Sequence, residues 1–370
     1  MRNEQTTDER AMRFALGLAE NGRFTTAPNP MVGAIVVNDG RIVGQGWHKQ
    51  AGGPHAERVA LADAGIEAHG ATIYVTLEPC SHTGRTGPCT EAILEAGISR
   101  VVIGASDPNP KAAGGAEVLR NAGLDVVTGV LKEECEALNR DFLDRIRNRR
   151  PFVTMKIAMT ADGHTSTASG ASKWITGEES RKHVHEDRGR SAVILTGVGT
   201  VFADNPALTC RVGGGKDPIR VVLDTHLRIP ADATLAMTAA ETPTILACCD
   251  FDPDKAKALE DSGCEIWMMN EKDGRVDLSE LIARIGAEGY DSVFIEAGPT
   301  VAWSALSAGV VDKLQIYVAP KIFGGTGRTA VGGPGVPLPK DAFQLCDPRI
   351  TAIGDDILVE YDIKHPERIS

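Results

Sequence analysis

The segment TIYVTLEPCSHTGRTGPC, residues 72–89, opens with a strand-like run and ends on the second of two cysteines. Its first seven residues are mostly apolar, β-branched or aromatic, which is typical of a buried strand. Cys80 follows this run in E-P-C, and eight residues separate it from Cys89. The pattern predicts a strand whose carboxyl end carries two thiols joined by a long loop.

A histidine and a glutamate lie upstream of this segment. His55 and Glu57 stand in P-H-A-E-R, where a helical segment begins. One histidine and two cysteines suit zinc, and three protein ligands leave the fourth tetrahedral position for water, as in catalytic zinc sites. We therefore predict one zinc ion held by His55, Cys80 and Cys89.

Such a site predicts hydrolytic chemistry in which Glu57 moves protons. Metal coordination lowers the pKa of bound water toward about 7, so hydroxide becomes available at neutral pH. Glu57 is placed to take the proton from that water and to deliver it to a leaving amine. H-x-E followed by P-C and a second cysteine is the signature of zinc deaminases, although its usual second half is C-x-x-C. We predict a zinc-dependent pyrimidine deaminase.

Two other interpretations of these residues stay open. His82 lies between the cysteines and would close a structural zinc site as a fourth ligand, in a nucleotide-binding or regulatory protein. A nucleic-acid-editing deaminase would carry a basic face and aromatic stacking residues, whereas this chain has a net charge of −11 and 5% aromatic residues. We expect no nucleic-acid partner, and we expect His48 and His69 to be ordinary surface or packing residues.

The composition indicates a globular protein of two domains. The chain has 370 residues, of which 42% are hydrophobic, enough for two separate cores. Its first residues do not read as a signal sequence, and no window approaches the roughly 18 apolar residues of a membrane span. The eight cysteines are too scattered for a disulfide scaffold. We expect a cytoplasmic protein with reduced cysteines and no membrane association.

Strand-like and helical runs alternate in both halves, which predicts α/β layers. In the first half we expect an opening helix at 8–20 capped by Asp8, a hairpin of strands 32–37 and 41–47 turning at Asn38-Asp39-Gly40, strands at 72–78 and 100–105, and helices at 56–64 and 90–96. A charged helix at 132–150 runs into Pro151, where we place the boundary between domains 1–150 and 151–370. Further strands are expected at 152–160, 192–196, 219–224, 244–249, 292–297 and 313–320.

Four motifs taken together carry a family resemblance. They are T-x-P-N-P-x-V-G from Thr26 to Gly33, P-H-A-E at 54–57, E-P-C-S-H-x-G-R-T-x-P-C at 78–89 and D-P-N-P at 107–110. With a second α/β domain behind them, they resemble the RibD family of bifunctional riboflavin-biosynthesis enzymes over nearly the whole chain. Two departures are visible, because Ala34 and Gly87 stand where cysteine and proline are common.

The resemblance implies both the fold and the reactions. It implies a cytidine-deaminase-like α/β/α domain followed by a dihydrofolate-reductase-like α/β domain. The first would deaminate 2,5-diamino-6-ribosylamino-4(3H)-pyrimidinone 5′-phosphate, and the second would transfer a hydride from NADPH to C1′ of the ribose. The cofactors would be one zinc ion and NADPH, and the partners small pyrimidine ribosyl phosphates. We also expect a homo-oligomer.

The resemblance also implies substrate contacts in the first domain. Asn29, Asp107 and Asn109 would face the pyrimidine and the ribose, and Arg85 in the long loop would contact the phosphate. Asn29 and Asn109 each precede a proline, so a simple turn role stays open for both. Arg85 could equally be a solvated loop charge.

In the second half, one segment stands out before any family is considered. In SVFIEAGPTVAWSAL, residues 292–306, a buried strand ends at Glu296 and a helix follows Gly298. Glycine allows a close backbone approach, and the first amides of the helix could hold a pyrophosphate. A tight strand-to-helix turn without a ligand is the alternative.

The resemblance extends to the contacts of the second domain. It implies cofactor contacts at Ala158, Trp174, Thr200, Asp204, Thr225, Gly298, Pro299 and Thr300, and substrate contacts at Lys156, Ser172, Arg188, Leu208, Arg211 and Glu296. Arg188 and Arg211 would hold the substrate phosphate, since arginine offers a planar fork that lysine lacks. Asp204, Lys156 and Glu296 are all candidates for proton handling, and the sequence does not choose among them.

Overall fold

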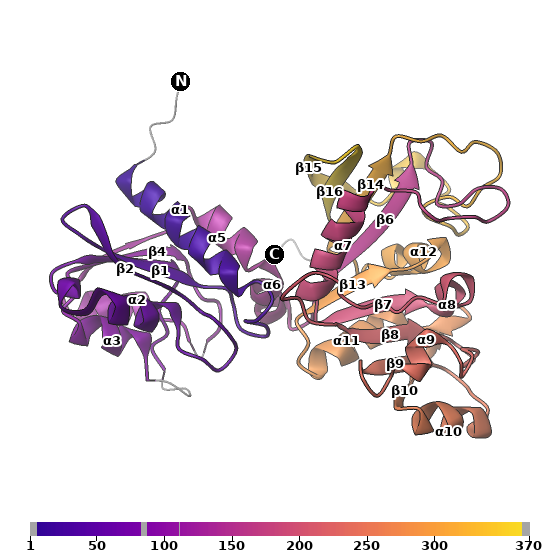
Figure 1. Cartoon of the computed structure of the whole chain (residues 1–370), viewed down its shortest axis with the longest axis horizontal. Coiled ribbons are helices and arrows are strands. Elements are labelled where there is room, and N and C mark those ends of the chain that lie inside the picture. Colours follow the sequence, from indigo (N-terminus) through magenta and orange to yellow (C-terminus); the bar gives the residue numbers. More distant parts are fainter. Residues whose placement is uncertain (1–5, 83–86, 111, 365–370) are drawn as a thin grey trace. The chain divides into compact units, whose positions relative to one another are not determined.

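The computed structural model describes residues 6–82, 87–110 and 112–364. The chain separates into two compact units, Met1–Arg149 and Arg150–Ser370. Each unit has its own β-sheet with helices packed against it (Figure 1). The two units are described in turn.

The N-terminal unit is built on a five-stranded sheet in the order β2-β1-β3-β4-β5. Its strands are β1 (Gly33–Asn38), β2 (Arg41–Trp47), β3 (Thr72–Leu77), β4 (Arg100–Ala105) and β5 (Asp125–Thr128). β1 runs antiparallel to β2 and β3, whereas β3, β4 and β5 are parallel. The predicted hairpin is confirmed, because Asp39 and Gly40 turn the chain between β1 and β2 with φ of 48° and 76°.

Helices cover both faces of this sheet. The helices are α1 (Thr7–Ala19), α2 (Ala56–Ala64), α3 (Cys89–Glu95), α4 (Gly115–Asn121), α5 (Lys132–Leu138) and α6 (Arg140–Asn148). Apolar side chains of α2, α3 and α4 share one buried cluster with the sheet, and those of α1, α5 and α6 share another. The expected α/β/α domain is therefore confirmed.

The opening helix has a different cap from the one predicted. The hydroxyl of Thr6 accepts a hydrogen bond from the Glu9 amide at 3.2 Å, and the Glu9 carboxylate accepts from the Thr6 amide at 3.0 Å, which is a capping box. Asp8 instead pairs with Arg100 at 2.8 Å and accepts from the Tyr74 hydroxyl at 2.9 Å. The prediction that Asp8 caps the helix was wrong because its carboxylate is engaged by the sheet.

The prediction of one charged helix at 132–150 is also wrong in one respect. The segment forms two helices, α5 and α6, which meet at Asn139 with φ −114° and ψ 25°. The helix breaks there because the Asn139 side chain hydrogen-bonds to the backbone of Met31, far away in the sequence. Asparagine often competes in this way with regular helix bonding.

The C-terminal unit is built on a nine-stranded sheet in the order β10-β9-β8-β7-β13-β6-β14-β16-β15. Its strands are β6 (Phe152–Thr160), β7 (Val193–Gly197), β8 (Ile219–Leu223), β9 (Thr244–Cys248), β10 (Cys264–Met268), β13 (Ser292–Glu296), β14 (Lys313–Ala319), β15 (Leu345–Ile353) and β16 (Asp356–Ile363). Pairing is parallel from β10 to β14, and β16 and β15 add an antiparallel edge. A separate ribbon pairs β11 (Glu271–Lys272) with β12 (Arg275–Val276).

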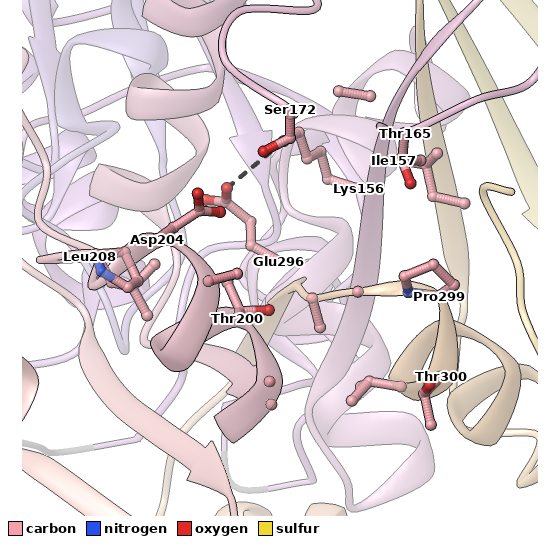
Figure 2. A pocket seen from close by; sticks show the side chains of 18 of the residues that line it. Lys156, Ile157, Thr165, Ser172, Thr200, Asp204, Leu208, Glu296, Pro299 and Thr300 are labelled. Carbon is pink, nitrogen blue, oxygen red and sulfur yellow. Dashed lines mark ion pairs between the residues drawn. The ribbon is translucent and has the colours of Figure 1, made fainter. Parts of the chain in front are cut away.

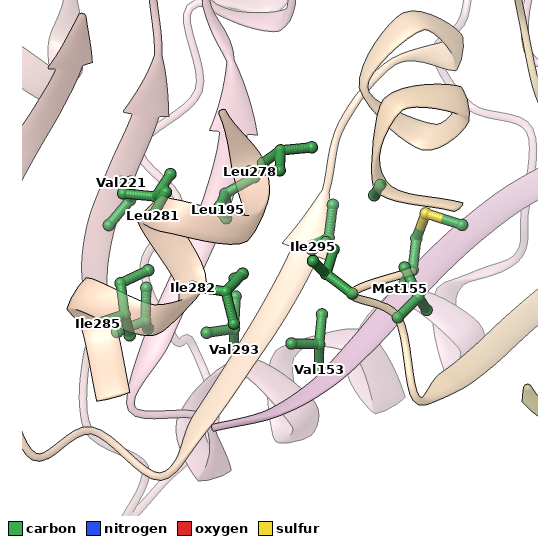
Figure 3. Packing of buried hydrophobic residues seen from close by; sticks show 14 of the residues in the cluster. Val153, Met155, Leu195, Val221, Leu278, Leu281, Ile282, Ile285, Val293 and Ile295 are labelled. Carbon is green, nitrogen blue, oxygen red and sulfur yellow. The ribbon is translucent and has the colours of Figure 1, made fainter. Parts of the chain in front are cut away.

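Helices lie on both faces of this sheet as well. They are α7 (Glu178–Arg190), α8 (Val198–Asp204), α9 (Thr234–Met237), α10 (Pro253–Asp261), α11 (Leu278–Ala287) and α12 (Pro299–Ser307). Figure 3 shows Leu281 and Ile285 of α11 against Val221 and Val293 of the sheet. The strands β6, β7, β8 and β13 are parallel and end at one edge, so the loops that follow them gather there.

Candidate functional site

The three predicted zinc ligands converge at the ends of regular elements. His55 is the N-cap of α2, Cys89 is the first residue of α3, and Cys80 follows the end of β3. Their ligand atoms all lie within 4.8 Å of one another. The Nδ1 atom of His55 is 3.5 Å from Sγ of Cys80 and 3.2 Å from Sγ of Cys89. Tetrahedral zinc with ordinary bond lengths places such N and S atoms about 3.6 Å apart, so the donor set fits the metal.

The environment of the thiols also suits a metal. Cys80 and Cys89 are buried, and a hydrogen bond from the Cys89 thiol, helped by one from His55, holds the pKa of Cys80 below that of a free thiol. Zinc binds cysteine as the thiolate. The site therefore favours one thiolate, at Cys80, whereas the hydrogen bond to Cys80 and burial raise the pKa of Cys89, so the second thiolate depends on the charge of the metal.

Glu57 lies in the first turn of α2 and is 3% exposed. Burial raises the pKa of its carboxyl above the usual value. A carboxyl whose pKa moves toward neutrality can both accept and return a proton. The side chain therefore has the character that proton transfer requires.

The alternative of a closed structural site is not supported by the described residues. Among them, the group of close metal-binding atoms comprises His55, Cys80 and Cys89. His82 is exposed and does not belong to that group. Three protein ligands leave a coordination position open, as in catalytic zinc sites.

A cavity of about 500 Å³ opens beside the metal-binding group. It is lined by His55, Glu57 and Cys80 and by three predicted substrate contacts, Asn29, Asp107 and Asn109. The structure thus brings these side chains into one cavity. Arg85, the fourth predicted contact, lies outside the described residues.

His48 lines the same cavity, although we expected it to be an ordinary surface or packing residue. Its side chain is almost fully buried. Nε2 lies 3.3 Å from Nδ2 of Asn29, and Nδ1 donates to the Pro54 carbonyl at 3.0 Å. The sequence did contain an indication of this role, because His48 is a polar residue that directly follows a half-buried strand.

Glu78 is a second lining residue that the sequence did not single out. Its carboxylate accepts hydrogen bonds from the backbone amides of Asp107 at 3.3 Å and Ala116 at 3.0 Å. The Asp107 carboxylate in turn accepts from the Asn109 amide at 2.9 Å. Glu78 therefore orders the D-P-N-P wall of the cavity.

A larger cavity of about 1440 Å³ lies at the carboxyl ends of the parallel strands in the C-terminal unit (Figure 2). All fourteen predicted contacts of this unit line it: Lys156, Ala158, Ser172, Trp174, Arg188, Thr200, Asp204, Leu208, Arg211, Thr225, Glu296, Gly298, Pro299 and Thr300. Pockets for one small ligand usually measure about 300 to 1,000 Å³. The volume fits a dinucleotide together with a second molecule.

An ion-pair cluster forms one side of this cavity. Glu296 ends β13 and makes two hydrogen bonds with Arg188 of α7, at 2.5 and 3.1 Å. Lys156 of β6 lies 3.6 Å from the same carboxylate (Figure 2). Burial alone would raise the pKa of Glu296, but the charges of Arg188 and Lys156 outweigh it and lower that pKa. Glu296 is therefore a carboxylate at neutral pH.

The strand-to-helix turn after Glu296 has the predicted form. Gly298 is the N-cap of α12, and Pro299 is its first residue. Within the described part of the chain, no side chain caps this helix start. The first-turn amides of a helix favour anions, so the turn fits the pyrophosphate of a dinucleotide.

The loop that carries Ser172 and Trp174 is held by two cations that sequence reasoning missed. Nζ of Lys321 donates to the carbonyls of Trp174 at 2.9 Å and Ile175 at 2.5 Å. Arg181 donates to the Thr176 carbonyl at 2.7 Å, and its guanidinium lies 4.6 Å from the centre of the Trp174 ring. Lys321 stands more than a hundred residues from its partners in the sequence, so no local pattern announces it.

Comparisons with known proteins match both units of the chain. The family model described as cytidine and deoxycytidylate deaminase zinc-binding region matches residues 5–105, and that described as RibD C-terminal domain matches residues 151–359. The riboflavin biosynthesis protein RibD of Actinobacillus pleuropneumoniae is 45% identical over 362 residues, 97% of this chain and 96% of the relative. That of Escherichia coli (strain K12) is 42% identical over 369 residues, 95% of this chain and 98% of the relative.

Solved structures of the same kind match over almost the full length. Form 1 of Acinetobacter baumannii RibD is 34% identical with a TM-score of 0.86, and covers 97% of this chain and 99% of its own. A Thermotoga maritima diaminohydroxyphosphoribosylaminopyrimidine deaminase/5-amino-6-(5-phosphoribosylamino)uracil reductase is 35% identical with a TM-score of 0.82, and covers 96% and 99%.

The fold and the sites define an enzyme in which a zinc-dependent, cytidine-deaminase-like domain precedes a dihydrofolate-reductase-like domain. The chain belongs to the RibD family. It is a bifunctional deaminase and reductase of riboflavin biosynthesis, with zinc in the first domain and NADPH as the reductant of the second. Among the described residues, no helix combines the length and the apolar character needed to cross a membrane.

Proposed function

We propose that the N-terminal unit, residues 1–150, deaminates 2,5-diamino-6-ribosylamino-4(3H)-pyrimidinone 5′-phosphate. In this proposal the C-terminal unit, residues 151–370, then reduces the ribose of the deaminated product. The observation that carries the proposal is the buried carboxyl of Glu57, which lines one cavity together with His55 and Cys80. The name of the Thermotoga maritima relative contains the same two activities in this order.

Deamination replaces the 2-amino group of the pyrimidinone by a carbonyl oxygen from water. Zinc, when bound by His55, Cys80 and Cys89, supplies the Lewis acidity that activates the attacking water. Glu57 carries both protons of that water, one to the ring nitrogen N1 and one to the amino group, which leaves as ammonia while the oxygen becomes the carbonyl. The raised pKa of the Glu57 carboxyl supports a role as both acceptor and donor.

Three polar side chains are proposed to orient the pyrimidine and the ribose above Glu57. Asn29 offers an amide that can both donate and accept, so it can read a ring edge that carries both kinds of group. Asp107 and Asn109 are held by Glu78 and by each other, which supports a preorganised wall. Arg85 remains our candidate for the phosphate in this unit.

In the C-terminal unit, NADPH is proposed to lie along Thr200, Thr225 and the start of α12. When bound it supplies the hydride that C1′ of the ring-opened ribose accepts. Trp174, Ala158, Asp204, Gly298, Pro299 and Thr300 are proposed to contact it. All of these residues line the same cavity, which supports the assignment.

The substrate of the reductase is proposed to lie against Lys156, Ser172, Leu208 and Glu296. Reduction also requires a proton, and the side chain of Lys156, which lines the cavity, is a hydrogen-bond donor. Glu296 is less suited to donate a proton, because its pKa is lowered. Burial raises that pKa, but the charges of Arg188 and Lys156 outweigh burial. Of these two candidates we therefore favour Lys156 as the proton donor, with Asp204 as the third candidate.

Arg188 and Arg211 are proposed to bind the substrate phosphate in the reductase. Both line the cavity, and a guanidinium matches a phosphate through two parallel hydrogen bonds. Because Arg188 is also paired with Glu296, we assign the larger share of phosphate binding to Arg211.

We further propose a cytoplasmic homo-oligomer that acts on small molecules and not on nucleic acid. The net charge of −11 supports the last point. The strand β15 forms one edge of its sheet and exposes apolar side chains, among them Ile350 at 72%, and such an edge favours association. Light scattering on the purified protein would show more than one chain per particle.

A coupled assay on the diaminopyrimidinone phosphate tests the proposed function. Ammonia release and NADPH oxidation are followed separately in the same sample. We expect ammonia to appear without NADPH, and NADPH oxidation to begin only as the deaminated product accumulates. Oxidation of NADPH before any ammonia would reverse the order of the reactions, and absence of both signals would refute the substrate.

A further inference from the structure

The junction between α5 and α6 contributes to the deaminase cavity. Phe142 of α6 lines that cavity. Asn139 stands three residues earlier, at the break between the helices, and is only 4% exposed. A buried amide without hydrogen-bond partners is costly. The partners of Asn139 therefore indicate why the helix is broken at this place.

Both polar atoms of the Asn139 amide bond to the backbone of one residue, Met31. The amide group of Met31 donates to Oδ1 at 2.7 Å, and Nδ2 donates to the Met31 carbonyl at 2.7 Å. Two residues of paired antiparallel strands exchange hydrogen bonds in the same way. Met31 lies before β1, which begins at Gly33, so a side chain here replaces a strand partner.

Met31 lies in the loop that forms one wall of the deaminase cavity, between residues that line it. Its neighbours Asn29, Pro30 and Val32 line the cavity directly. On the other side, His48 holds the same loop, because its amide donates to the Val32 carbonyl at 2.9 Å and its ring lies 3.3 Å from Nδ2 of Asn29. The loop is thus fixed at two points, and these set the place of the Asn29 amide.

We propose that Asn139 is a positioning residue of the deaminase, which places Asn29 against the pyrimidine by holding the backbone of Met31. This inference rests on the proposed function of the N-terminal unit, in which Asn29 contacts the substrate. A binding group that is held in place in advance loses less conformational freedom when the ligand binds. Loss of Asn139 should therefore raise KM for the pyrimidine while zinc and the reductase are unaffected.

A double-mutant cycle on the full-length zinc enzyme tests this inference. Asn139→Ala and Asn29→Ala should each raise KM for deamination about tenfold, the equivalent of one hydrogen bond. The double variant should be no worse than Asn29→Ala alone, because Asn139 acts through Asn29. Asn148→Ala, an exposed asparagine at the end of α6, is the matched control and should leave KM unchanged.

The reductase activity and the zinc content of each variant report whether the chain is folded. Multiplicative effects of the two substitutions, or equal losses of both activities, would overturn the inference in favour of a merely structural role. Asn139→Asp provides a second variant, because it keeps the acceptor for the Met31 amide but sets a buried carboxylate oxygen against the Met31 carbonyl. Its effect on KM should be at least as large as that of Asn139→Ala.

Hydrogen exchange at the Met31 amide separates this inference from the proposed function, because it needs no substrate. The amide should be protected in the wild type, should exchange at least tenfold faster in Asn139→Ala, and should stay protected in Asn29→Ala. An unprotected wild-type amide, or one that Asn139→Ala leaves unchanged, would refute the contact itself. Failure of the wild type to release ammonia would instead refute the proposed function.

Discussion

Arg188 and Glu296 lie on one side of the reductase cavity as a two-point ion pair, with Nε–Oε1 at 2.5 Å and Nη2–Oε2 at 3.1 Å. A third guanidinium nitrogen, Nη1, donates to the Thr209 carbonyl at 3.1 Å. Both side chains were predicted to contact substrate, and each is now seen to hold the other. Removing one partner of a buried ion pair strongly destabilises the folded protein. A substitution of Arg188 therefore also changes the environment of Glu296, and the reverse is equally true.

The arginines at this cavity should therefore differ in their response to truncation. Arg211→Ala should lower kcat/KM for the phosphorylated intermediate by about 10- to 150-fold, the loss of one charge-assisted hydrogen bond. Arg188→Ala should lower it further, because the buried Glu296 loses its closer cationic partner and keeps Lys156 at 3.6 Å. NADPH affinity should barely change in either variant, as measured by fluorescence titration. Weaker NADPH binding with intact discrimination for phosphate would place both arginines at the cofactor instead.

The pH dependence of Arg188→Ala follows from the same pair. In the wild type the pKa of Glu296 is lowered, because Arg188 and Lys156 outweigh burial. Removing Arg188 leaves burial in place, so the pKa should rise. A function that needs ionised Glu296 is then lost as the pH falls through this higher pKa. In a plot of reductase activity against pH, the acidic limb should move to higher pH in Arg188→Ala. If it does not move, ionised Glu296 is not required for the reduction.

Replacing Glu57 by glutamine should separate metal binding from proton transfer. The side chain is not one of the grouped ligands, so Glu57→Gln should retain zinc by elemental analysis. Ammonia release should fall by about 10²- to 10⁴-fold, the usual contribution of general acid–base catalysis. The exposed Glu67 offers a control, since Glu67→Gln should keep full activity. Near-normal deamination by Glu57→Gln would disprove the mechanism.

Loss of the metal should silence one activity only. Cys80→Ser, or treatment of the wild type with a chelator, should remove zinc and stop ammonia release. Reduction of supplied deaminated intermediate should continue, because that step uses no zinc. Cys346→Ser, at a half-buried thiol of the other unit, should change neither activity. A folded Cys80→Ser enzyme that lost both activities would mean that the two sites are coupled.

Lys321 should matter to NADPH although it is not among the described residues that line the cavity. Lys321→Met removes the donor to the carbonyls of Trp174 and Ile175 and keeps most of the stem. We expect the KM for NADPH to rise about tenfold, since the loop is no longer held in place. Deamination in the same chain should be unchanged. Lys340→Met, at an exposed lysine, is the control. If it raises the KM for NADPH as much as Lys321→Met does, the effect does not come from the contacts of Lys321.

Much of the metal site could be read from local sequence. The residues of the site each lie near the start or the end of a strand or helix: His55, Glu57, Cys80 and Cys89. The spacing of apolar residues in the sequence locates such strands and helices. Chemistry also constrains them, because few residue types bind zinc. Neighbours without such a signal, such as His48 and Glu78, were overlooked.

The edge of the large sheet shows the opposite case. β15 and β16 were not predicted, because most residues of β15 are exposed and the strand contains Pro348. Strand prediction depends on burial of alternate residues or of whole runs, and an exposed edge strand shows neither pattern. β16 is held by hydrogen bonds to β14, which a reading of its own residues does not reveal.

By itself the sequence determined the α/β class, most of the parallel strands, though not β5 and β10, and the residues of the candidate metal site, because these follow from short-range patterns of burial and from residue chemistry. Only the tertiary structure decided where Asn139 breaks its helix, which carbonyls Lys321 holds and that Arg188 pairs with Glu296. The partners in these contacts lie more than a hundred residues apart. Their geometry arises only when separate elements pack, so no local pattern encodes it.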